Sequence, residues 1–231
     1  MRSPVQTRFE ELPAHVPIFP LSGALLLPWG RLPLNIFEPR YLNMTLDALM
    51  VGRIFGMIQP DHDKTPKDKI GADKMPHEVE PMLYNIGCAG RIASFEETED
   101  GRLLIMMKGL CRFRVVKEID GRAGYRRVQA SYDAFKTDMD PLPKFDLNRE
   151  DLFVHLKPYL ESHSMPVSID VLKGLSDFTL ITSLCMICPF DPREKQALLE
   201  TETISDRTAT LIKLLQMGVF DASASPNAPK Q

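Results

Sequence analysis

The residues best suited to chemistry in this 231-residue sequence are Cys185 and Cys188, in the motif Cys-Met-Ile-Cys. Thioredoxin-type redox pairs and halves of zinc sites use this spacing. A redox pair opens a helix, where the helix dipole lowers the thiol pKa, whereas this pair ends a predicted helix in an apolar run. Cys88 and Cys111 lie on separate predicted strands and do not complete a set of four zinc ligands. We therefore predict buried, reduced thiols and no metal.

Other catalytic constellations are not found in the sequence. The histidines stand alone without metal-ligand spacing: His15, His62, His77, His155 and His163. There is no Gly-x-Ser-x-Gly nucleophile elbow, and no Gly-x-x-x-x-Gly-Lys-Ser/Thr loop that would hold ATP phosphates. The sequence therefore predicts a chain that is not an enzyme and needs no cofactor.

Composition limits the classes of partner. A net charge of -3 gives no global electrostatic reason to bind nucleic acid or an anionic membrane. The chain opens without an apolar leader, and no apolar run approaches the ~20 residues of a membrane helix. With reduced cysteines as well, these features predict a soluble, cytoplasmic protein, which we expect to be a monomer or weak dimer.

Basic residues crowd two adjacent predicted strands and suggest an alternative function. The candidate nucleic-acid contacts are Arg112, Arg114, Arg126 and Arg127. However, Glu118 and Asp120 lie among them, and no series of aromatic residues accompanies the cations to stack on bases. RNA or other nucleic-acid binding therefore stays the alternative to a solvated outer face.

The elements that position these residues begin with a proline-rich apolar stretch at residues 16–41. Its prolines are Pro17, Pro20, Pro28, Pro33 and Pro39. Because each proline fixes φ and removes a donor, one long helix or an ordinary central strand is excluded. The stretch is predicted to form extended pieces at 16–21, 24–27 and 32–37, with turns at Ser22-Gly23 and Trp29-Gly30.

A helix is predicted next, over residues 39–50, because Pro39 suits the first helical position. Gly52 is expected to end it in a left-handed conformation, and a strand follows at 53–59. The predicted buried stripe of the helix is Leu42, Leu46, Leu49 and Met50. Residues 61–81 alternate charges and prolines, which predicts a long solvated loop or, alternatively, a loop that contacts a partner.

Two hairpins follow. Strands at 83–97 and 102–119 are joined by the Asp100-Gly101 turn, and a second turn around Asp120-Gly121 and Gly124 leads into residues 125–135. The strands are interrupted by Gly87, Gly90 and Gly109, as expected for bulges in a strongly bent sheet that closes into a barrel.

The strand pattern ends after residue 136, and the rest of the sequence has helical spacing. Pro141 and Pro143 mark the boundary. Helix starts are predicted at Ser176, at Asp191 and at Ser205. The predicted organisation is a flexible lead-in at 1–12, a β-barrel subdomain at 13–136, a linker at 137–147, a helical bundle at 148–218 and a disordered tail at 219–231.

Several of these segments, in this order, carry a family resemblance. The segments PIFPL (17–21), LPWG (27–30), LPL (32–34) and FEPRY (37–41) resemble the start of the N-terminal substrate-binding domain of Lon proteases. The strands IGCAGRI (86–92) and GLCRFRV (109–115) and the helix PFDPREKQALLE (189–200) are similar to later parts of that domain. The chain looks like a stand-alone domain of this family, without the ATPase and peptidase that accompany it in Lon.

The resemblance implies an α+β fold: a PUA-like bent β-barrel with one inserted helix, followed by an α-helical subdomain. It also implies a polypeptide-recognition module that binds unfolded or extended segments or a protein partner, with a possible adaptor role in protein quality control. The candidate peptide-binding residues are Pro33, Phe37, Glu38, Pro39, Arg40 and Tyr41. The alternative is that Phe37 is core and that Glu38 and Arg40 only fix the corner.

Overall fold

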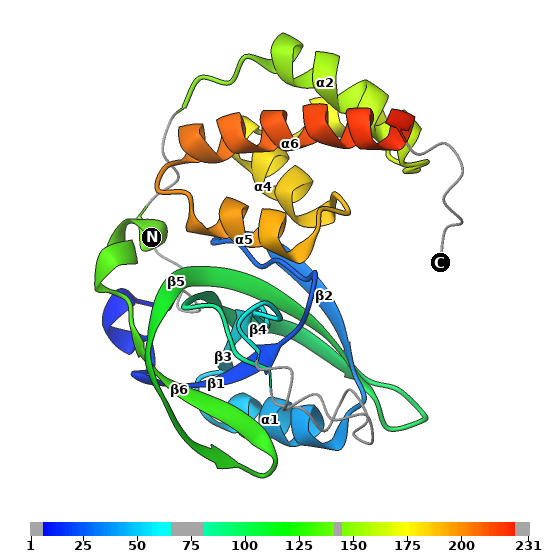
Figure 1. Ribbon diagram of the computed structural model, residues 1–231. Helices are drawn as coiled ribbons and strands as arrows, with labels where there is room; N and C mark the ends of the chain where they lie inside the picture. The colour runs from blue at the N-terminus through cyan, green and yellow to red at the C-terminus, as the bar shows by residue number, and fades with distance from the viewer. Residues whose placement is uncertain (1–6, 66–80, 141–144, 225–231) are drawn as a thin grey trace. The chain divides into compact units, whose positions relative to one another are not determined.

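The computed structural model describes residues 7–65, 81–140 and 145–224, and the chain forms two compact units, Met1–Pro141 and Leu142–Gln231. The first unit is built on a sheet and the second on helices, which confirms the α+β class (Figure 1). Most of the predicted loop at 61–81 lies outside the described residues, as do the first part of the lead-in and the end of the tail. Among the described residues, none of the helices combines the length and apolar character needed to span a membrane.

The strands of the first unit pair in a closed ring, because one long strand pairs with both ends of the series. Its strands are β1 (His15–Pro20), β2 (Arg31–Ile36), β3 (Ile54–Ile58), β4 (Ile86–Glu97), β5 (Leu103–Arg122) and β6 (Tyr125–Ser131). Their order is β2-β5-β4-β3-β1-β6, and β6 also pairs with β5. Strand β5 can have three partners because it is 20 residues long, so β2 and β6 pair with different parts of it. Hydrogen bonding therefore runs from β5 through β4, β3, β1 and β6 back to β5, with β2 outside this ring.

The predicted glycine bulge is confirmed at Gly90, and Gly87 and Gly109 lie where neighbouring groups approach the backbone closely. The β4–β5 register shifts between Ala89 and Gly90. A Cβ atom at Gly109 would collide with the carbonyl oxygen of Leu27, and a Cβ atom at Gly87 would lie 2.6 Å from the Phe113 ring. Phe113 is fully buried and is therefore a centre of the core inside the ring.

The proline-rich stretch folds largely as predicted. Ser22-Gly23 forms a turn, and the second turn falls on Pro28-Trp29, one residue earlier than predicted. The piece at 24–27 is not a strand, although Leu25, Leu26 and Leu27 are buried. These leucines fill the core without joining the β-ladder, so the prediction that this apolar run is core is confirmed.

Helix α1 spans Pro39–Met50, as predicted, and Gly52 after it has a left-handed φ of 75°. The predicted stripe was wrong, because Leu46 and Met50 are 52% and 75% exposed. The buried residues of the helix are instead Tyr41, Met44, Thr45 and Ala48. The helix is anchored by Tyr41, whose ring centroid lies 4.1 Å from that of Phe19 on β1, so the face toward the sheet is the one that contains Tyr41.

A 3-10 helix, η3 (Asp133–Met139), follows β6 and occupies the start of the segment that was predicted as a linker. Asp138 on η3 accepts hydrogen bonds from the backbone and the guanidinium of Arg112 on β5, at 2.8 to 2.9 Å. Residues up to 140 therefore belong to the first unit by their contacts.

The second unit contains α2 (Arg149–Ser162), α3 (Ile169–Lys173), α4 (Asp177–Ile187), α5 (Pro192–Glu200) and α6 (Ile204–Ala224). The caps predicted at Ser176 and Asp191 are confirmed, because each side chain accepts a bond from a backbone N–H of the first turn. The cap predicted at Ser205 was wrong, since Thr203 accepts from the N–H of Asp206 at 3.1 Å. The tail predicted from residue 219 was also wrong at its start, because α6 continues to Ala224.

Candidate functional site

Four of the six candidate peptide-binding residues meet where β2 ends and α1 begins. Phe37, Glu38, Pro39 and Arg40 line a depression of about 580 Å³, which we call the corner depression. Of the lining residues, Phe37 is 60% exposed, while its neighbour Ile36 is buried at 1%. Phe37 is therefore not part of the core, and one of the two readings of this residue is excluded. A large exposed aromatic side chain in a depression is a typical anchor point for a partner.

An ion pair fixes the polar side of the corner depression. Arg40 donates from Nε and Nη2 to Oε2 of Glu38 at 3.0 and 2.8 Å. Glu38 is the N-cap residue of α1, yet its side chain does not cap the helix. Because both groups are partly exposed, the pair contributes only ~0–1 kcal/mol to stability. Its effect is to orient Arg40, whose guanidinium lies 4.6 Å from the centroid of the Tyr41 ring.

Tyr41 is a candidate peptide-binding residue that proves to be buried and does not line the corner depression. It is 5% exposed and packs on Phe19, and burial raises the pKa of its hydroxyl above the usual value. Tyr41 is therefore a core residue that positions Arg40 from below.

Pro33 lies outside the corner depression, on the exposed face of β2. Among the described strands, β2 pairs only with β5, so its second edge is open. The N–H of Gly109 donates to the carbonyl of Gly30 at 2.9 Å, and antiparallel alternation then directs the backbone groups of residues 32, 34 and 36 toward β5. The groups of Arg31, Pro33 and Asn35 face the open edge, where Pro33 has no N–H to offer.

The four arginines proposed for the alternative nucleic-acid surface do not form one exposed patch. Arg112 is buried at 4%, where it pairs with Asp138 and stacks over the Phe135 ring. Arg126 donates from Nε and Nη2 to the carboxylate of Glu118 at 2.6 and 2.7 Å. Only Arg114 is well exposed, because Arg127 is half-buried. Arg112 was named as a candidate nucleic-acid contact, but Asp138 on η3 binds it in a buried position.

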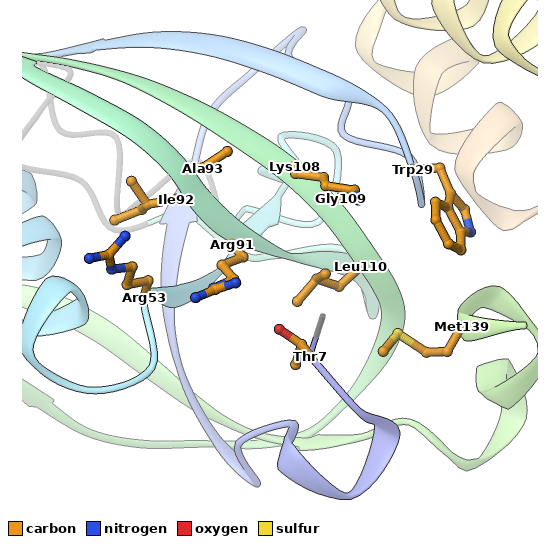
Figure 2. Close-up of a pocket in the computed structure, with 10 residues that line it drawn as sticks. All are labelled: Thr7, Trp29, Arg53, Arg91, Ile92, Ala93, Lys108, Gly109, Leu110 and Met139. Carbon is orange, nitrogen blue, oxygen red and sulfur yellow. The ribbon is translucent and has the colours of Figure 1, made fainter. Parts of the chain in front are cut away.

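A second cavity was not predicted from the sequence. It has a volume of about 380 Å³ and lies over β4 and β5 (Figure 2). Its lining residues are Thr7, Trp29, Arg53, Arg91, Ile92, Ala93, Lys108, Gly109, Leu110 and Met139. We call it the cationic cavity, because the described residues of its lining include two arginines and a lysine and no acidic residue. Only strand register brings Arg91 and Lys108 together, and sequence spacing alone did not show it.

The thiols match the prediction of burial. Cys185 and Cys188 are buried and free, and burial raises the pKa of each to about 12. A neutral thiol is a poor nucleophile and a poor metal ligand. In the described part of the chain, no group of three metal-ligating side chains comes together.

Comparison with known proteins gives one family. The model of the ATP-dependent protease La (LON) substrate-binding domain matches residues 15–217. Lon protease 2 of Myxococcus xanthus is 25% identical over 211 residues, which cover 89% of this chain and 24% of that protein. Lon protease of Anaeromyxobacter dehalogenans is 22% identical over 93% of this chain and 24% of its own length. The chain thus spans about a quarter of the length of these relatives.

Solved structures show the same fold. The Lon N-terminal domain protein from Xanthomonas campestris aligns with a TM-score of 0.55 and 22% identity, over 86% of this chain and 97% of that one. The N-terminal domain of the Mycobacterium avium complex Lon protease aligns with a TM-score of 0.52 and 15% identity, over 87% and 97% of the two chains. Because the family model covers most of the sequence, the chain belongs to the family of Lon substrate-binding domains.

Proposed function

We propose that this chain is a non-catalytic polypeptide-recognition module that binds extended or unfolded segments without nucleotide. The observation that carries the proposal is the 60% exposed Phe37 in the corner depression, next to the open edge of β2. An exposed strand edge offers backbone hydrogen bonds, and an aromatic anchor beside it offers apolar contact. Membership of the substrate-binding family supports the same ligand class.

The geometry of β2 limits how a peptide would add to the sheet. Asn35 offers both an N–H and a carbonyl at the open edge, while Pro33 offers only a carbonyl. A long added strand would therefore lose a hydrogen bond at Pro33. A short segment that pairs at Asn35 and places an apolar side chain on Phe37 avoids that loss. Pro33 would then restrict the length of peptide that can pair with β2. Prolines on edge strands reduce aggregation in the same way.

We further propose that the module works in the cytoplasm as an adaptor in protein quality control. The four free, buried cysteines fit a reducing compartment. Weak binding suits an adaptor because a client must be released again. We expect a Kd of roughly micromolar to millimolar for a single unfolded segment.

The test is NMR titration of the labelled protein with a casein-derived peptide. Shifts are expected to cluster at Asn35 to Arg40, and Phe37→Ala is expected to weaken binding by about tenfold through lost apolar contact. The matched control is Phe220→Ala, which removes another exposed phenylalanine, 73% exposed, from α6 of the second unit. A panel of unfolded peptides that leaves the spectrum unchanged at millimolar concentration would refute the proposal.

A further inference from the structure

The cationic cavity lies on a row of like charges that crosses three strands. Lys108 on β5 is the register partner of Arg31 on β2 and also of Arg91 on β4. Register partners in a sheet project their side chains to the same face, and like charges directly opposite each other are destabilising. The register therefore brings three cations onto one face of the sheet, and two of them, Arg91 and Lys108, line the cavity.

The wall of the cavity contributes a further cation. Arg53, just before β3, adds a cation to the lining, and the described lining residues include no acidic side chain. Met139 lies between two acidic residues in the sequence: Asp138, whose carboxylate is bound to Arg112, and Asp140, which is exposed and is not a lining residue. Lys108 instead places its Nζ 5.1 Å from the centroid of the Trp29 ring. Within the described part of the chain, neither Lys108 nor Arg53 forms a salt bridge.

The backbone around the cavity is held in an unusual conformation. Four non-glycine residues have positive φ in the described ranges, and two of them, Trp29 at 66° and Arg53 at 63°, line the cavity. A left-handed φ is costly for a bulky side chain and persists where surrounding bonds enforce it. Trp29 is fixed by bonds from its N–H to the carbonyl of Gly109 and from Nε1 to the carbonyl of Asp138, both 2.9 Å long. Such strain typically accumulates at binding sites.

The walls of the cavity indicate what kind of anion fits. Arginine side chains hold carboxylates through paired, charge-assisted hydrogen bonds. Ile92, Leu110 and Met139 add apolar surface beside the cations, and Figure 2 shows Arg53 and Arg91 on one side of Leu110 with Met139 and Trp29 on the other. The volume of about 380 Å³ holds a few side chains and is near the lower end for small-ligand sites.

From these observations we propose that the cationic cavity binds a carboxylate of a polypeptide client, with an adjacent apolar side chain of that client against Trp29 and Leu110. This inference rests on the proposed function and adds a preference for acidic and apolar residues in sequence. The net charge of -3 favours a local carboxylate over a long polyanion, since a nucleic acid would also meet the acidic remainder of the surface. The cavity would act as a second point of contact beside the corner depression.

Trp29 makes the proposal directly measurable, because it is the only tryptophan in the sequence. Its fluorescence is followed as the full chain is titrated with a short peptide of core Leu-Glu-Phe-Asp-Leu and, separately, with its uncharged twin Leu-Gln-Phe-Asn-Leu. We expect a saturable change with the acidic peptide, at least about tenfold weaker affinity for the twin, and loss of the difference in high salt.

Variants locate the effect within the cavity. Lys108→Gln and Arg53→Gln are each expected to weaken binding of the acidic peptide by about tenfold while leaving the twin unaffected. The matched control is Lys117→Gln, which removes the same charge from an exposed position of β5 outside the lining. Equal losses for Lys108→Gln and Lys117→Gln would attribute the preference to net charge and overturn the proposal.

Inorganic phosphate and an RNA oligonucleotide test whether another anion binds the cavity better than a carboxylate. The two peptides also distinguish failure of the cavity inference from failure of the proposed function. Inorganic phosphate or an RNA oligonucleotide that changes Trp29 fluorescence at lower concentration than the acidic peptide would overturn the assignment to a carboxylate. If both peptides bind equally and shift Phe37 and Arg40 in NMR spectra, the cavity inference falls while the proposed function stands. If neither peptide binds, both fall.

Discussion

The buried ion pair of Arg112 and Asp138 removes one arginine from the surface that was the alternative site for nucleic acid. Both side chains are nearly inaccessible, at 5% and 8% exposure, and three hydrogen bonds join them. The same Asp138 provides the carbonyl that holds Trp29 at the cationic cavity. Arg112, a candidate nucleic-acid contact by sequence, therefore holds Asp138 and with it η3 and one wall of that cavity.

The prediction at this scale is that Asp138→Ala destabilises the protein strongly. Arg112 would keep its buried charge without a partner, which typically costs about 3–5 kcal/mol. Urea unfolding followed by circular dichroism measures the loss. The control is Asp133→Ala on the same 3-10 helix, where the carboxylate is 82% exposed and only 3.5 Å from Lys136. A similar midpoint for the two variants would show that the buried pair contributes little.

At the scale of elements, local signals predicted the starts of helices better than their faces and ends. The Asp191-Pro192-Glu194 sequence predicts a helix start reliably, because its N-cap and capping-box hydrogen bonds form between residues of the same turn. The buried face of α1 depends instead on Tyr41 meeting Phe19 from β1, a contact between distant parts of the sequence. The apolar residues of α1 fit two adjacent helix faces, so their spacing was not sufficient to identify the buried one.

Gly218 is a second example, because the helical bundle was predicted to end at this residue. It lies inside α6, and a Cβ atom there would come within 2.5 Å of the Tyr159 ring on α2. Figure 1 shows α6 running alongside α2, the pair that this glycine brings together. The glycine is thus a packing residue, which only the structure of the helix pair makes visible.

The prediction for this element sets packing against helix propensity. Gly218→Ala gains about 1 kcal/mol of propensity but forces an overlap with the buried Tyr159 ring, which typically costs about 1–3 kcal/mol. We expect net destabilisation, measured as a lower Tm by calorimetry. Gly174→Ala is the control, since its nearest neighbour would be the Val171 carbonyl at 3.5 Å and its backbone is already right-handed. A rise in Tm for Gly218→Ala would mean that α2 and α6 pack more loosely than described.

At the scale of the molecule, the change from strand to helical pattern predicted two parts of the chain. The proline-anchored segments carried the family resemblance because prolines and turns are local constraints. The sites were harder to predict. Phe37 was named from its place in the motif, whereas the cationic cavity needs the β2–β5–β4 register and the left-handed turns at Trp29 and Arg53. Both depend on contacts between residues far apart in sequence.

The last prediction concerns where the first unit ends. The strand pattern stops at residue 136, but Asp138 completes the pair with Arg112 and fixes Trp29. A fragment of residues 1–141 should therefore fold more stably than one of residues 1–136, because the shorter fragment loses the bonds of Asp138 to Arg112 and to Trp29.

Thermal unfolding of the two fragments, followed by circular dichroism and by Trp29 fluorescence, measures the difference. The fragment 1–141 carrying Asp138→Ala is the decisive comparison, because it keeps the chain length and removes only the carboxylate. If it melts with the 1–136 fragment, the Asp138 contact marks the end of the unit. If instead all three fragments melt together, the unit ends at β6, and η3 is an attachment that adds no stability to it.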